Sequence, residues 1–213
     1  LDGSSAASDV YKRQIFLMNK LFRNNSEVNK SSPVKLSSHH LLAIEGMQKT
    51  EIQKLLDRAD YFANLDKHAD TKYLSGYVVL NVFFENSTRT RVSFELAARR
   101  LGAEVINISL INSSIKKGES LLDTASTLNA MKPDLLIVRH PHSGAPLLFA
   151  EYLSCSIINA GDGRHEHPTQ ALLDALTIKR RIGYLEGLRI SICGDIANTV
   201  SYTHLTLPTN HPV

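Results

Sequence analysis

Four short polar segments of this 213-residue chain carry the side chains that could do chemistry. Three of these segments follow apolar runs with the length and composition of a buried strand, and the second follows the strand AEVINIS (103–109). Most of their reactive side chains are cations, hydroxyls and amides, which donate hydrogen bonds and so favour recognition of an anion. The four segments are FFENSTRTR (83–91), SSIKKGESLLDT (113–124), VRHPHSGAP (138–146) and GRHEHPTQ (163–170).

The first segment predicts a phosphate site. Ser87, Thr88, Arg89 and Thr90 come where a strand gives way to a helix. The first N–H groups of a helix lack internal partners and carry the positive end of the helix dipole. Hydroxyls and a guanidinium at the same place add donors suited to an oxyanion. An ordinary helix cap with a solvated arginine remains an alternative.

The second and third segments add cations at two further strand ends. Lys116 and Lys117 precede a glycine and a helix start, where a solvated surface pair is the alternative. Arg139 and His140 end a wholly apolar strand. A guanidinium at that place needs an anion or a path to solvent.

The fourth segment places an imidazole and an amide at a helix start. His167 precedes Pro168, which is favoured as a first helical residue, and Gln170 lies in the first turn. An imidazole and a carboxamide at a helix N-terminus could polarise a carbonyl oxygen, as donors of an oxyanion site do.

The sequence predicts no metal site, no disulfide and no cofactor. Histidines and a glutamate gather near strand ends, but HEH (165–167) lacks the spacing of the zinc motif HExxH. Cys155 and Cys193 lie in apolar runs, which predicts buried, reduced thiols and a reducing compartment. There is no Gly-rich dinucleotide turn and no Ser/His/Asp set.

Strands and helices alternate along the chain, which predicts an α/β fold with a parallel sheet and helices on both of its faces. Thr50 is predicted to cap the first of these helices, with Gln53 three residues later. In such sheets ligands bind beyond the carboxyl ends of the strands. Strands are expected at 77–84, 103–109, 134–140, 156–162 and 188–195, and helices at 50–65, 87–102, 119–131, 143–153 and 168–182.

The composition excludes several classes of protein. With 43% hydrophobic and 21% charged residues, the chain is of the ordinary soluble globular class. The net charge of +3 is spread along the chain without the basic stripe of a nucleic-acid-binding protein. No apolar run approaches the roughly 20 residues of a membrane span. We therefore expect a cytoplasmic protein that binds neither nucleic acid nor membrane.

The chain resembles the aspartate carbamoyltransferases from about residue 38 to residue 199. STRTR, the Lys-Lys-Gly-Glu loop, RHP followed by SGA, and HPTQALLD occur in this order in that family. STRTR and HPTQ are also similar to ornithine carbamoyltransferases, whereas RHPHSGA and SSIKKGES favour the aspartate enzymes. An ornithine enzyme and a non-catalytic scaffold domain of the same family remain alternatives.

The resemblance implies transfer of the carbamoyl group from carbamoyl phosphate to L-aspartate, giving N-carbamoyl-L-aspartate and phosphate in pyrimidine biosynthesis, without a cofactor. Ser87, Thr88, Arg89 and Thr90 would hold the phosphate. Arg139 would bridge the phosphate and carbonyl oxygens. His167 and Gln170 would contact the carbamoyl group.

The resemblance also implies a homotrimer with shared active sites. Lys117, with Ser113 or Ser114, belongs to a loop that in the family reaches into the site of the neighbouring subunit. Whether regulatory chains associate is left open.

The sequence departs from the family pattern at both ends. After GDIAN it continues as Thr199, Val200 and SYTHLTLPTNHPV, with no arginine after Arg189 and two prolines that oppose a helix. We expect a truncated fragment with foreign sequence at both ends and little transferase activity. The expected divisions are a mostly unstructured leader (1–38), a carbamoyl-phosphate-binding domain (39–185), the start of an aspartate-binding domain (186–199) and an atypical tail (200–213).

Overall fold

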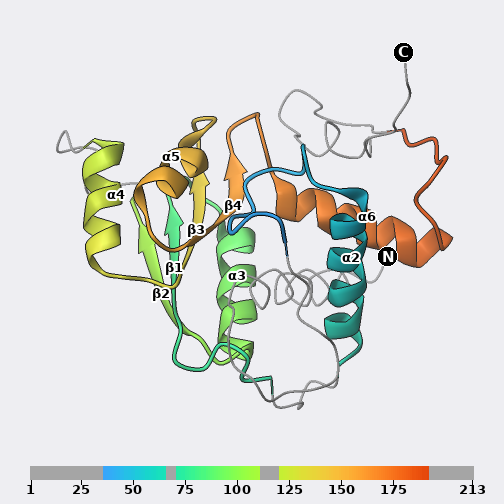
Figure 1. The fold of residues 1–213 in the computed structure, drawn as a ribbon, viewed down its shortest axis with the longest axis horizontal. Coiled ribbons are helices and arrows are strands. Elements are labelled where there is room, and N and C mark those ends of the chain that lie inside the picture. Colours follow the sequence, from blue (N-terminus) through green and yellow to red (C-terminus); the bar gives the residue numbers. More distant parts are fainter. Residues whose placement is uncertain (1–35, 66–70, 111–119, 192–213) are drawn as a thin grey trace.

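The computed structural model describes residues 36–65, 71–110 and 120–191, in which strands and helices alternate (Figure 1). Residues 1–35 of the expected leader, the expected tail and Cys193 lie outside these residues. No helix of the described ranges is both long and apolar enough to cross a membrane. The elements in chain order are α2 (Lys49–Asn64), β1 (Val78–Phe83), α3 (Thr88–Arg100), β2 (Glu104–Ser109), α4 (Leu121–Ala130), β3 (Leu135–His140), α5 (Ala145–Tyr152), β4 (Ser156–Asp162) and α6 (Pro168–Ile182).

The four strands form one parallel sheet in the order β2-β1-β3-β4. The α/β prediction is therefore confirmed. From β1 the chain moves outward to β2, then returns to the other side of β1 for β3 and β4. The strand order thus reverses between β1 and β3, and ligands of open α/β sheets bind at such a reversal.

Helices cover both faces of the sheet, because β1, β3 and β4 carry buried side chains on both sides. On one face α2, α3 and α6 pack a core that includes Phe83, Phe94 and Ile158. On the other face α4 and α5 pack a smaller core around Val82 and Phe149. Alternate residues of β1 point into the two cores.

The two edges of the sheet differ. At the β4 edge, the Leu41 N–H donates to the Ile157 carbonyl (2.8 Å) and the Leu41 carbonyl accepts from the Asn159 N–H (2.9 Å), so residue 41 closes that edge. At the other edge, no described strand pairs with the outer side of β2. Ile106 of β2 is 51% exposed. The β2 edge therefore presents unpaired backbone groups and apolar side chains.

Two expectations about local structure are corrected. Helix α2 begins at Lys49 rather than after Thr50, and the Gln48 N–H donates to the Glu51 carboxylate (3.3 Å). That carboxylate also accepts from the Ser37 N–H (2.6 Å), so a contact with the preceding segment fixes the helix start. The expected strand at 188–195 is absent over 188–191, and its remaining residues lie outside the described ranges.

The buried thiol expected from the sequence is present. Cys155 is free and packs in the core beside α4 and α5. Burial raises the pKa of its thiol to about 11, because an apolar environment disfavours the thiolate. Cys155 is therefore an unreactive core residue near neutral pH.

Candidate active site

The start of α3 has the properties expected of an anion site. Ser87 is the N-cap residue, and its hydroxyl does not cap its own helix. The first turn contains no acidic side chain. Arg89 is exposed, and the side chains of Ser87 and Thr90 are half-buried. The first turn of α3 follows the carboxyl end of β1 after four residues, and the helix dipole at that turn favours an anion.

Arg139, on the neighbouring strand, is held by groups of two adjacent elements. In the parallel register it pairs with Phe83, the last residue of β1. Its Nε forms an ion pair with the carboxylate of Glu85, and its Nη1 donates to the Ala160 carbonyl (3.4 Å). The side chain is 25% exposed. The guanidinium thus lies at the strand-order reversal, within reach of solvent or a ligand.

Gly161 brings Arg139 close to His167. Its φ of +117° lies outside the range that L side chains readily adopt. A Cβ at this position would lie 3.4 Å from His167 Cδ2 and 3.5 Å from Arg139 Nη1. The imidazole and the guanidinium therefore approach the same small backbone surface at the end of β4.

His167 and Gln170 begin α6 as the sequence predicts. His167 is the N-cap residue, and Pro168 occupies the first turn. The His167 Nδ1 lies 3.4 Å from the Thr169 hydroxyl. The Gln170 side-chain amide donates to Asp174 one turn further along the helix (2.9 Å). A contact between Gln170 and a carbamoyl group stays a prediction.

The structure therefore brings Arg139 and His167 together. It places the STRT segment (87–90) just after the end of β1, the strand next to β3. Lys117, Ser113 and Ser114 lie in 111–119, outside the described residues. Sequence reasoning missed Glu85, although it is part of the FFENSTRTR segment, because its role depends on β1 lying next to β3. Gly161 and Asp162 were also missed, although the strand SIINAGD contains both.

Two further histidines near the strand ends, His140 and His165, are engaged by protein groups. His140 is 5% exposed, and its Nδ1 accepts from the His142 N–H (2.9 Å). Burial lowers the pKa of His140, so the ring is neutral near pH 7. The His165 Nδ1 pairs with Asp162 (3.0 Å). Within the described ranges, no group of three or more His, Cys, Asp or Glu side chains could hold a metal ion.

Glu166 provides a pH-dependent prediction. It is 4% exposed, and burial raises its pKa, opposed by a hydrogen bond from the Ile44 backbone. The folded chain holds this proton more tightly than the unfolded chain. The resulting stability is therefore present at low pH and is lost as the pH rises from the ordinary value of 4.5 through the raised pKa.

We expect Glu166→Gln to raise the thermal unfolding midpoint near neutral pH by a few degrees, because glutamine can still accept from Ile44 and carries no charge. The difference from the unmodified chain should vanish below about pH 4. Exposed Glu104→Gln is the matched control, with no change at either pH. A Glu166→Gln variant that is less stable than the unmodified chain near neutral pH would contradict this account.

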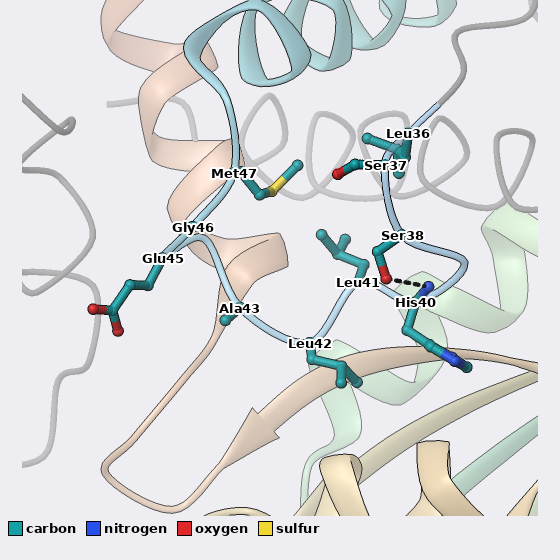
Figure 2. Close-up of a pocket in the computed structure, with 10 residues that line it drawn as sticks. All are labelled: Leu36, Ser37, Ser38, His40, Leu41, Leu42, Ala43, Glu45, Gly46 and Met47. Carbon is teal, nitrogen blue, oxygen red and sulfur yellow. Dashed lines mark hydrogen bonds between the residues drawn. The ribbon is translucent and has the colours of Figure 1, made fainter.

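A separate hollow of about 230 Å³ lies in the segment that precedes α2. In Figure 2 the side chains of Leu36, Leu41 and Met47 point toward one another, whereas Glu45 points away. The Ser38 hydroxyl accepts from the His40 N–H (3.1 Å), as the dashed line shows. None of the strand-end residues described above lines this hollow.

Comparison with known proteins identifies one family. The family model described as "Aspartate/ornithine carbamoyltransferase, carbamoyl-P binding domain" matches residues 39–180. The aspartate carbamoyltransferase catalytic subunit of Dinoroseobacter shibae is 61% identical over 168 residues, covering 77% of this chain and 52% of the relative. The corresponding subunit of Rhodospirillum rubrum is 60% identical over 162 residues, covering 75% and 51%. The chain spans about half the length of the curated relatives it matches.

Solved structures give the same result. The aspartate transcarbamoylase of Trypanosoma cruzi, solved in complex with carbamoyl phosphate and aspartate, matches with a TM-score of 0.72 and 36% identity, over 78% of this chain and 55% of that one. The catalytic subunit of M. jannaschii aspartate transcarbamoylase matches with a TM-score of 0.70 and 42% identity, over 78% and 55%.

Proposed function

Because the chain belongs to the aspartate/ornithine carbamoyltransferase family and matches its carbamoyl-P binding domain, we propose that the ends of β1, β3 and β4 bind carbamoyl phosphate. The observation that carries this proposal is the approach of Arg139 and His167 to Gly161, beside the uncapped start of α3. A phosphate group suits the helix start, and a carbonyl oxygen suits the guanidinium and the imidazole.

The full-length protein transfers the carbamoyl group to L-aspartate in this proposal. The lone pair of the aspartate amine attacks the carbonyl carbon and forms a tetrahedral oxyanion. The bond from that carbon to the phosphate oxygen then breaks, and the leaving phosphate accepts the amine proton. Negative charge therefore grows on the carbonyl oxygen and on the phosphate, and no protein base is required.

Different residues at the strand ends stabilise the negative charge on the phosphate and on the carbonyl oxygen. Ser87, Thr88, Arg89 and Thr90 hold the phosphate at the start of α3. Arg139 reaches both the phosphate and the carbonyl oxygen, and His167 donates to the carbonyl oxygen. Donors fixed before the reaction stabilise the developing charge without reorganisation.

Aspartate is favoured over ornithine as the acceptor by the RHPHSGA and SSIKKGES segments and by the relatives' names. The matched family model describes a carbamoyl-P binding domain, and the chain spans about half of its relatives. We therefore place the groups that bind the aspartate carboxylates in the other half of a full-length protein. This assignment makes the chain a carbamoyl-phosphate-binding unit of cytoplasmic pyrimidine biosynthesis.

A homotrimer with shared sites completes the proposal. The segment with Lys117 and with Ser113 or Ser114 follows β2, the strand at the open edge of the sheet. Exposed apolar side chains of β2 and of α3, which packs on β2, support an interface there, with Ile106 51%, Val92 41% and Leu96 39% exposed. In this arrangement Lys117 would reach the phosphate bound by a neighbouring subunit.

Calorimetry with phosphonoacetamide tests the proposed binding. In this ligand a methylene replaces the bridging oxygen of carbamoyl phosphate, so it does not hydrolyse. Arg89→Ala should weaken binding by about tenfold or more, because a charge-assisted hydrogen bond to phosphate is lost. Arg99→Ala, on the same helix and paired with Glu95, is the control and should bind as the unmodified chain does. Equal phosphonoacetamide affinity in the Arg89→Ala and Arg99→Ala variants would contradict the proposed site.

A further inference from the structure

We propose that Asp162 is a positioning residue of this site: its carboxylate joins the loops after β3 and β4 and so sets the separation of Arg139 and His167. The inference rests on the proposed function, because the two residues matter together only if they share a ligand.

The Asp162 carboxylate is buried and accepts from four donors. The residue is 1% exposed. Its Oδ1 accepts from the Glu166 N–H (2.8 Å) and from the Asn159 side-chain amide (3.0 Å). Its Oδ2 accepts from the Gly144 N–H (2.8 Å) and pairs with the His165 Nδ1 (3.0 Å). Four donors match the acceptor capacity of an ionised carboxylate.

These donors come from the two loops that carry the site. Gly144 lies in the loop that leaves β3 after Arg139, and it is the N-cap residue of α5. Glu166 immediately precedes His167, the N-cap residue of α6. One carboxylate therefore fixes the backbone on both sides of the position where Arg139 and His167 approach Gly161.

Backbone contacts show how closely the two loops pass. The Gly163 N–H, in the loop after β4, donates to the His140 carbonyl at the end of β3 (2.9 Å). Within the loop after β4, the Asp162 N–H donates to the Glu166 carbonyl (3.1 Å). A Cβ on Gly163 would lie 2.5 Å from the Pro141 carbonyl oxygen, so only glycine fits without a shift. The loops lie in contact, and the carboxylate sets their relative position.

The same network reaches Gly161 through Asn159. Asn159 is 1% exposed. Its side-chain NH₂ donates to Asp162, and its side-chain carbonyl oxygen accepts from the Gly161 N–H (2.8 Å). The positive φ of Gly161, which opens the space shared by Arg139 and His167, is therefore held by Asp162 and Asn159 together.

Asparagine at position 162 would place its NH₂ group against groups that now donate hydrogen bonds to the Asp162 carboxylate. Its NH₂ group would face either the two donors now at Oδ1 or the two at Oδ2, and a buried unpaired donor is unfavourable. The loops would relax apart, and the carbonyl end of the ligand would lose its fixed donors. The phosphate end is held by the start of α3, which is not one of the two loops that Asp162 joins.

The test compares two ligands in one variant. In Asp162→Asn we expect the phosphonoacetamide Kd to rise about tenfold or more, equivalent to ~1.4 kcal/mol, and the inorganic phosphate Kd to rise by less than about threefold. The carbonyl ¹³C shift of bound phosphonoacetamide should move toward its value in free solution. The control is Asp134→Asn, which loses an acceptor of the Val78 N–H (2.8 Å) at the opposite end of the strands and should change neither Kd.

Each outcome separates the inference from the proposed function. Equal weakening of both ligands, or no weakening of either, in Asp162→Asn overturns the positioning role while the proposed site stands. If the unmodified chain binds neither ligand, the proposed site and the inference fall together. His165→Ala keeps the test decisive should Asp162→Asn not fold, because that side chain is 58% exposed. It removes one of the four donors and should raise only the phosphonoacetamide Kd, by about twofold to threefold; an unchanged Kd contradicts the role.

Discussion

Arg139→Met is expected to weaken phosphonoacetamide binding by about 10-fold to 150-fold, because a charge-assisted hydrogen bond contributes about 1.5–3 kcal/mol. The guanidinium is the cation at the strand-order reversal, held by Glu85 and the Ala160 carbonyl. Methionine keeps the length of the side chain and removes the charge. The variant also leaves the Glu85 carboxylate uncompensated beside the ligand, which adds repulsion of the anion.

The matched control is Arg180→Met. Arg180 also makes an ion pair, with Asp60 (2.6 Å), and it lies at the α2–α6 contact away from the strand ends. It should leave binding unchanged within about twofold, because exposed ion pairs contribute little and the site is remote. Similar loss of binding in both variants, measured by calorimetry, would mean that Arg139 supports the fold rather than the ligand.

Phe94→Ala is expected to reduce the free energy of unfolding by about 3–5 kcal/mol. Phe94 is fully buried beneath α3, in the core shared by α2, α3 and α6. Truncation leaves a cavity under the helix whose first turn carries the phosphate donors. The loss is comparable with the whole stability of a marginal domain, so binding at ambient temperature should fall with it.

Urea denaturation measures this effect, with Leu147→Ala as the control. Leu147 is 54% exposed on α5, so its truncation should change the free energy of unfolding by no more than about 0.5 kcal/mol. Similar losses in both variants would contradict the assigned core.

The alternation of apolar runs and amphipathic segments was enough to predict the parallel sheet and helices on both faces. It was also enough to locate Arg139 at a strand end, because a charged residue after a wholly apolar run is distinctive, and to locate His167 before Pro168 at the start of α6. The sequence alone did not show whether Arg139 is neutralised by an anion or reaches solvent. Its partner is Glu85, 54 residues away, and that contact depends on β3 lying beside β1.

Other features depend on tertiary contacts that local patterns do not encode. Asp162 reads as the end of an apolar strand, and its role follows from two loops meeting around it. The start of α2 was misplaced because the Glu51 carboxylate pairs with Ser37, 14 residues earlier. Local capping preference favoured Thr50, and the tertiary contact decided otherwise.

The most direct test of the central claim is calorimetric titration of the unmodified chain with N-(phosphonacetyl)-L-aspartic acid, which joins both substrate halves, and with phosphonoacetamide. The account assigns the phosphate and carbonyl donors to this chain and the aspartate-binding groups to the other half of a full-length protein. It predicts that both ligands bind within about threefold of each other, a difference below ~0.7 kcal/mol, and that inorganic phosphate displaces both. Failure of both ligands to bind, or binding that inorganic phosphate does not displace, would contradict it.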